Sequence, residues 1–193
     1  MQTGTQEGFA PVNYLIDISA SRFTVQAFAT GLLSSFGHNP TIGMRDYDGE
    51  IHFVPETFER PHVRVTVRTG AMEVLDEMKS DDRRKLEQEM YEKVLEAQRF
   101  PTAMFDSKQI NVQKMSENVF QALVTGELSF HGVTRGHSFD ARVTSLGTML
   151  RISGDFPLRQ SDYGVKAFSF AGGALRLKDE LKFKFELQAR KQE

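Results

Sequence analysis

The stretch LKFKFELQA, residues 181–189, carries an apolar side chain at every second position and a polar or charged one in between. Successive side chains of a β-strand point to opposite faces of the sheet. The alternation therefore predicts a strand with one face in the protein interior and the other in water. One strand cannot bury such a face alone, so the rest of the chain must supply partners for it.

The same period of two recurs along most of the chain. It is clear in residues 22–29, 63–67 and 139–143, where apolar residues alternate with polar or charged ones. Further candidate strands cover residues 13–19, 49–54, 104–112, 119–130 and 149–158. We therefore expect about nine strands joined by short turns. Such a succession predicts an all-β antiparallel meander that closes as a barrel or packs as a sandwich.

Residues 80–98 break this pattern. Leu86, Met90, Val94, Leu95 and Ala97 are spaced for one face of a helix, and most of the remaining residues are charged. Ser80 or Asp81 can accept hydrogen bonds from the free N–H groups of the first turn, and Pro101 follows soon after the end. We expect this one α-helix to pack on the barrel or to cover one of its mouths.

We interpret residues 13–193 as a single domain that follows a loose polar segment, residues 1–12. The longest irregular stretch covers residues 31–48, which are rich in Gly, Ser, Asn and Pro. Loops of this length often carry function, so Phe36 and His38 are candidate ligand contacts. His38 could donate a hydrogen bond to a ligand head group, or it could stabilise a turn through a backbone bond.

Composition excludes several classes of function. The chain of 193 residues has no cysteine, which rules out disulfides, thiolate metal sites and cysteine nucleophiles. A net charge of -2 without a basic tract argues against a nucleic-acid partner. No apolar run is long enough for a membrane-spanning helix, and the first residues have no signal-peptide pattern. We therefore expect a protein that does not span a membrane and that lies in the cytoplasm.

The sequence contains none of the phosphate-binding, nucleophile-elbow or zinc-helix motifs. A turn centred on Thr134 would make His131 and His137 cross-strand partners, and we favour a solvated pair over a metal site there. Asp17 and Asp162 are the carboxylates with the most apolar neighbours, and we expect turn formation or a salt bridge from them. We therefore predict a protein that is no enzyme, with no metal and no cofactor.

The interior carries the strongest signal. Sixteen Phe and four Tyr accompany no Trp, so most of the aromatic surface has no polar group. An eight-stranded barrel is just wide enough to be filled by its own side chains or to hold a small ligand. The alternation points nine candidate ligand contacts inward: Phe23, Val25, Ala27, Val65, Val67, Phe105, Phe139, Phe183 and Phe185.

Four motifs in order resemble those of the YceI-like proteins. They are Tyr-Leu-Ile-Asp at 14–17 before the first alternating strand, and the charged helix leading into Phe-Pro-Thr-Ala-Met-Phe-Asp-Ser at 100–107. The others are the hairpin Gly-Glu-Leu-Ser-Phe-His-Gly-Val-Thr-Arg at 126–135 and the turn Ser-Asp-Tyr-Gly at 161–164. The resemblance covers most of the chain. It implies a bacterial, lipocalin-like antiparallel β-barrel that binds polyisoprenoid or related long-chain lipids.

The resemblance adds Asp162 and Tyr163, from the last motif, to the candidate ligand-binding residues. Two positions depart from the family: Ala20 precedes Ser21 where His-Ser is common, and Gln160 stands where an arginine often precedes Ser-Asp. A head-group contact by that arginine therefore cannot be carried over. Many members are exported, so the location would be periplasmic if a leader had been removed from this chain.

Together these observations predict a non-enzymatic carrier of a long-chain amphiphilic lipid, either polyisoprenoid or fatty-acyl, that could form a homodimer. Two alternatives stay open. One is a filled barrel that acts through its surface as a stress-response or interaction module. The other is a metal-assisted activity that uses His38, His131 and His137.

Overall fold

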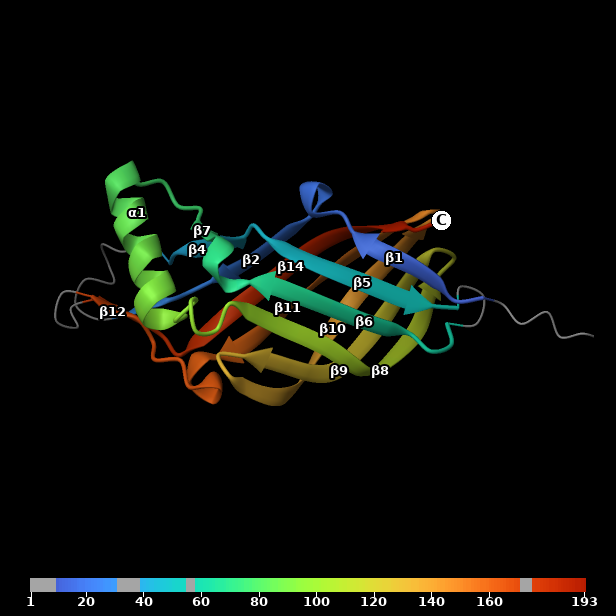
Figure 1. Cartoon of the computed structure of the whole chain (residues 1–193). Coiled ribbons are helices and arrows are strands. Elements are labelled where there is room, and N and C mark those ends of the chain that lie inside the picture. The colour runs from blue at the N-terminus through green and yellow to red at the C-terminus, as the bar shows by residue number, and fades with distance from the viewer. Residues whose placement is uncertain (1–9, 31–38, 55–57, 171–174) are drawn as a thin grey trace, which may run out of the picture.

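The computed structural model describes residues 10–30, 39–54, 58–170 and 175–193, and it places most of them in antiparallel strands (Figure 1). Eight strands form a closed barrel in the order β1-β5-β6-β8-β9-β10-β11-β14, and β14 pairs with β1 to complete the circle. Their bounds are β1 Val12–Ile16, β5 Tyr47–Phe53, β6 His62–Arg68, β8 Thr102–Ser116, β9 Val119–Phe130, β10 Val133–Leu146, β11 Met149–Arg159 and β14 Glu180–Lys191.

Short strands extend this barrel at one end. β2 (Arg22–Gln26) pairs with the first half of β14, whereas β1 pairs with its last residues. The short helix η1 (Ile18–Ala20) separates β1 from β2, so the two share one edge of β14. β4 (Thr41–Met44) and β7 (Met72–Val74) then continue the sheet beyond β2. A small second sheet joins β12, β13 and β3, which are Ser169–Phe170, Leu175–Leu177 and Ala29–Thr30.

The strands expected from the alternation are all present, and the predicted barrel with a single α-helix is confirmed. The irregular stretch expected over residues 31–48 is partly wrong, because β4 and the start of β5 lie within it. The local sequence did not indicate β4, because this strand is formed by pairing with β2 and β7, which are distant in sequence. The backbone N–H of Thr41 also donates to Asp76 Oδ2 at 2.7 Å, which holds β4 in place.

The helix is shorter than the predicted range of residues 80–98. α1 covers Ser80–Glu89 and continues as one π-helical turn, η3, over Met90–Val94. In this turn the N–H of Leu95 donates to the carbonyl of Met90 at 2.9 Å, and both side chains are buried. Because a π-helical turn contains one residue more than an α-helical turn, Met90 and Leu95 lie on the same side of the helix although they are five positions apart. Glu96 then takes a positive φ of 44° and ends the helix.

α1 and η3 close one end of the barrel (Figure 1). They lie beside β7, whose outer edge would otherwise leave backbone groups without partners. The N–H of Val74 donates to Glu87 Oε1 at 2.9 Å, and the hydroxyl of Tyr91 donates to the carbonyl of Met72. The expectation of a helix that packs on the barrel is therefore confirmed. In the described part of the chain, no helix has the length and apolarity that crossing a membrane requires.

Two glycines allow phenylalanine rings to lie across the barrel wall. A Cβ atom at Gly126 would come within 2.7 Å of Phe105 Cζ and within 2.4 Å of a backbone oxygen. A Cβ atom at Gly154 would come within 2.5 Å of Phe185 Cζ and equally close to the backbone oxygen of Asp140. Each ring covers the backbone of a neighbouring strand, a device that supports a curved sheet at glycine positions.

We predict that Gly154→Ala lowers the free energy of unfolding by about 1–3 kcal/mol, because the new methyl group displaces the ring of Phe185. Gly136→Ala is the matched control, since nothing lies within 4 Å of the place that its Cβ would take and it too lies in a strand. Urea unfolding of both variants measures the difference. Equal stability of the two variants would show that the ring does not depend on the glycine.

Candidate functional site

The barrel encloses a cavity of about 690 Å³, which is inside the range of about 300–1,000 Å³ usual for ligand pockets. Every one of the eight barrel strands contributes side chains to its wall, and α1 and η3 add Leu86, Met90 and Val94 at one end. The wall consists almost entirely of aliphatic and aromatic side chains. Such a lining favours hydrocarbon over water.

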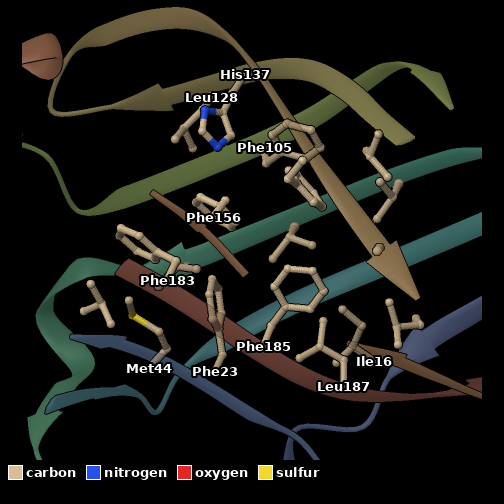
Figure 2. A pocket seen from close by; sticks show the side chains of 18 of the residues that line it. Ile16, Phe23, Met44, Phe105, Leu128, His137, Phe156, Phe183, Phe185 and Leu187 are labelled. Carbon is tan, nitrogen blue, oxygen red and sulfur yellow. The ribbon is translucent and has the colours of Figure 1, made fainter. Parts of the chain in front are cut away.

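Phenylalanines from several strands meet inside the cavity (Figure 2). The ring of Phe156 on β11 stacks on that of Phe183 on β14, with ring centroids 5.0 Å apart and an interplanar angle of 1°. Phe139 on β10 lies 5.2 Å from Phe156 in a second stacked pair. Phe23 on β2 meets Phe185 edge to face at 6.4 Å. These mutual contacts hold the rings in place, so the apolar surface is formed in advance of any ligand.

The nine side chains that the alternation pointed inward all line this cavity, so their orientation is confirmed. Their contact with a ligand stays a prediction. They come from four barrel strands and from β2 with the residue just after it: Phe23, Val25, Ala27, Val65, Val67, Phe105, Phe139, Phe183 and Phe185. Two further candidates, Phe36 and His38, lie outside the described residues.

Asp162 and Tyr163 do not line the cavity, so the structure does not bring them together with the other candidates, and their contact with a ligand stays a prediction. Asp162 lies on the outside, with a carboxylate oxygen 3.4 Å from Nη1 of Arg135. Tyr163 is buried in a small apolar cluster. Ser161 donates its backbone N–H and its hydroxyl to the Asp179 carboxylate at 2.7 and 2.6 Å. The Ser-Asp-Tyr-Gly turn is therefore a packed corner of the fold.

The expected cross-strand pairing of His131 with His137 is wrong. His131 and Gly132 both take positive φ values, 50° and 77°, and form a two-residue turn between β9 and β10. This tighter turn places His137 opposite Gly126, and Nε2 of His131 lies 2.9 Å from a Glu96 carboxylate oxygen. Among the described residues, no three metal-ligating side chains gather at one place.

His137 is the titratable imidazole of the cavity wall. Its ring meets that of Phe156 edge to face at 4.8 Å and points into the space between Leu128 and Phe105 (Figure 2). Burial lowers the pKa of His137 below the ordinary 6.5 and keeps the imidazole neutral. Its Nε2 is enclosed and has no hydrogen-bond partner in the described part of the chain. The cavity wall thus includes a neutral polar group, the imidazole of His137, whose Nε2 lacks a hydrogen bond within the described part of the chain.

The strongest charge interactions lie on the outer wall. Asp106 on β8 accepts hydrogen bonds from Lys108 at 3.1 Å and Arg64 at 2.9 Å, and Nε2 of His62 is 3.1 Å away. These donors, Lys108 first, lower the pKa of Asp106 to about 2. Asp17 accepts from Ser19 and Arg190, which lower its pKa to about 2. The predicted salt bridge of Asp17 is confirmed, and both carboxylates connect parts of the wall.

Several polar residues of the cavity wall escaped the sequence reasoning: Lys114, Asn118, Ser145, Gln160 and Lys191. The amide of Gln160, a position noted only as a departure from the family, donates to the carbonyl of Lys178 at 3.0 Å. Lys191 continues the apolar alternation of β14 and could have been found by extending it. Lys114 could not have been found in this way. A β-bulge between Ser107 and Gln109 shifts the alternation of β8 by one residue, so different positions face the cavity after the bulge.

An eight-stranded antiparallel barrel around an apolar cavity defines the class of lipocalin-like barrels. Residues 14–189 match the family model of the YceI-like domain. The protein therefore belongs to the YceI-like family. Among proteins of curated function, none matches the sequence of this chain.

Solved structures of low sequence identity share the fold. BcnA of Burkholderia cenocepacia is 17% identical with a TM-score of 0.70, and the match covers 90% of this chain and 98% of BcnA. A polyisoprenoid binding domain from Saccharophagus degradans is 13% identical, with a TM-score of 0.68 and coverage of 92% and 97%. The YceI protein of Campylobacter jejuni is 17% identical, with a TM-score of 0.62 and coverage of 81% and 88%.

We predict that His137→Leu raises the free energy of unfolding by about 1 kcal/mol at pH 7.5, because it removes an enclosed nitrogen without a partner. The wild-type protein also loses stability as the pH falls below about 6.5. The lowered pKa means that the unfolded chain binds a proton there more readily than the folded protein does.

Urea unfolding at pH 7.5 and pH 5.5 tests both statements, with His52→Leu on the outer face of β5 as the control substitution. The loss between the two pH values should shrink in His137→Leu and persist in the control. A loss of the same size in all three proteins would contradict the assignment of a buried neutral imidazole.

Proposed function

We propose that this protein binds a long-chain amphiphilic lipid inside its barrel and carries it without catalysing a reaction. The observation that carries the proposal is the apolar cavity of about 690 Å³. Membership of the YceI-like family supports it, because a relative with this fold is described as a polyisoprenoid binding domain. The cargo would be a prenyl or fatty-acyl chain.

The energy of burial is sufficient for such binding. A hydrocarbon chain that loses roughly 400 Å² of exposed surface gains about 10 kcal/mol at about 25 cal/mol per Å². Association costs of about 4 kcal/mol, the low end expected for a preformed site, leave about 6 kcal/mol, which corresponds to a dissociation constant of tens of micromolar (~40 μM). The stacked rings of Phe139, Phe156 and Phe183 form such a site.

A barrel filled by its own side chains was the main alternative. Such a barrel would leave no cavity of this size, so the observed volume favours a carrier over a module that acts through its surface. A metal-assisted activity receives no support from His131 and His137, since His131 lies in a turn beside Glu96 and His137 faces the cavity.

Native mass spectrometry of the purified protein, followed by extraction with organic solvent and lipid analysis, tests the proposal directly. A bound species with a prenyl or acyl mass is the expected result. A protein that carries no lipid and that also fails to bind added oleyl alcohol or farnesol would contradict it.

We predict that the double variant Val65→Phe/Val143→Phe binds lipid at least tenfold more weakly, because two added rings occupy the cavity. Thr66→Phe/Thr144→Phe is the matched control, since each residue is one position along the same strand and faces outward. Calorimetric titration with oleyl alcohol measures both affinities. If the inward pair bound lipid as tightly as the control, the ligand would occupy another place.

A further inference from the structure

The inward face of the barrel changes character towards one end. On β8 the inward positions run from Ile110 through Val112 to Lys114, and on β14 they run through Leu187 to Lys191. Lys114 is directly opposite Phe120, and Lys191 is directly opposite Tyr14. Cross-strand partners point to the same face, and both aromatic partners line the cavity. The two lysines therefore end two inward rows of apolar side chains.

Other polar residues surround the same end. Asn118 and Ser145 line the cavity there, and the N–H of Ser145 donates to the carbonyl of Asn118 at 2.8 Å. The hydroxyl of Tyr14 is 3.4 Å from the carbonyl of Gly147, and the N–H of Lys191 donates to Thr148. These contacts gather the β8–β9 turn, the β10–β11 turn and the C-terminal end of β14. Figure 1 shows this C-terminal end at the opposite end of the molecule from α1.

The inward lysines differ from the outward ones in their charge partners. On the barrel strands, Lys108, Lys182 and Lys184 each have the ammonium within 3.1 Å of a carboxylate oxygen. Lys114 and Lys191 form no ion pair with any described residue. An exposed ammonium at the edge of an apolar cavity attracts an anion more strongly than one already paired. Within the described part of the chain, this end of the cavity thus carries two positive charges without an ion-pair partner.

The other end of the cavity is covered by α1 and η3 and has no charged lining residue in the described part of the chain. Gln160 lines it too, with its side-chain amide donating to the carbonyl of Lys178. Leu86, Met90 and Val94 of α1 and η3 line it together with Leu158 and Leu181. A charged group would be expensive there, because it would lose its hydration without gaining a partner of opposite charge. The two ends therefore select different parts of an amphiphilic ligand.

We propose that Lys114 and Lys191 form a head-group site for a single-chain lipid with an anionic head, either a carboxylate or a phosphate monoester. This inference rests on the proposed lipid-carrier function and specifies its cargo and orientation. The head lies between the two ammonium groups in contact with water, and the chain extends towards α1. β14 measures about 33 Å between Leu181 and Lys191, or about 25 Å along the barrel axis, which accommodates a long chain.

Calorimetric titrations with three ligands of the same chain test the head group: oleate, oleyl phosphate and oleyl alcohol. The wild-type protein should bind both anions about tenfold more tightly than the alcohol, and added salt should reduce this preference. Lys114→Met/Lys191→Met should lose the preference while it keeps the affinity for oleyl alcohol. That unchanged affinity also shows that the variant is folded.

Lys182→Met/Lys184→Met is the matched control, because it removes the same charge from the outer face of β14. It should keep the preference for anions. Equal affinity of the wild-type protein for all three ligands, or loss of the preference in the control as well, would overturn the head-group site and leave lipid binding intact. Failure of all three ligands to bind would overturn the carrier function and the head-group site together. A preference for only one anion identifies the head group as carboxylate or phosphate.

Orientation has its own test. Stearate that carries a nitroxide near its carboxylate, at carbon 5, should broaden the amide NMR signals of Asn118 and Gly147. Stearate labelled at carbon 16 should instead broaden those of Leu86 and Val165, near α1. The reverse pattern would place the head group at the covered end and would overturn the proposal.

Discussion

Backbone hydrogen bonds between β14 and β1 join the two ends of the chain and convert an open sheet into a barrel. β14 can do this because it is long: its first half pairs with β2, its last residues pair with β1, and its other edge pairs with β11 throughout. Closure gives each of the eight barrel strands a neighbour on both sides and turns their inward positions towards one shared volume. The cavity, its aromatic wall and its two different ends all follow from that closure.

Phenylalanine side chains contribute both to the wall of the barrel and to the surface of its cavity. Phe105 and Phe185 lie against Gly126 and Gly154, and so cover the backbone where the sheet curves. Phe156 stacks with its neighbours around the cavity. Rings that support one another in this way leave space that is apolar and fixed in shape. In the proposed function, such a space would bind hydrocarbon by burial alone, and the charged end would add selectivity for the head of the ligand.

Sequence reasoning succeeded where the relevant physics is local. The strands and their inward residues followed from the alternation, and the helix followed from its spacing. The expected hydrogen bonds from Ser80 or Asp81 to the first turn did not hold, because Lys79 begins the helix without a side-chain cap. Sequence reasoning failed where a turn or a bulge changed which residues of a strand share a face. A two-residue turn at His131 removed the expected histidine pair, and the bulge before Gln109 concealed Lys114. Asp162 and Tyr163, taken from the family motif, are parts of a packed corner outside the cavity.

The sequence by itself determined the type of each strand and the face to which its side chains point, because side-chain direction has a period of two in any extended chain. Only the tertiary structure decided the volume that these faces enclose and the polar groups that share it. Tyr14 and Lys191 are cross-strand partners although they are near opposite ends of the chain. Such a contact depends on strand order and closure, which involve every turn and bulge between them.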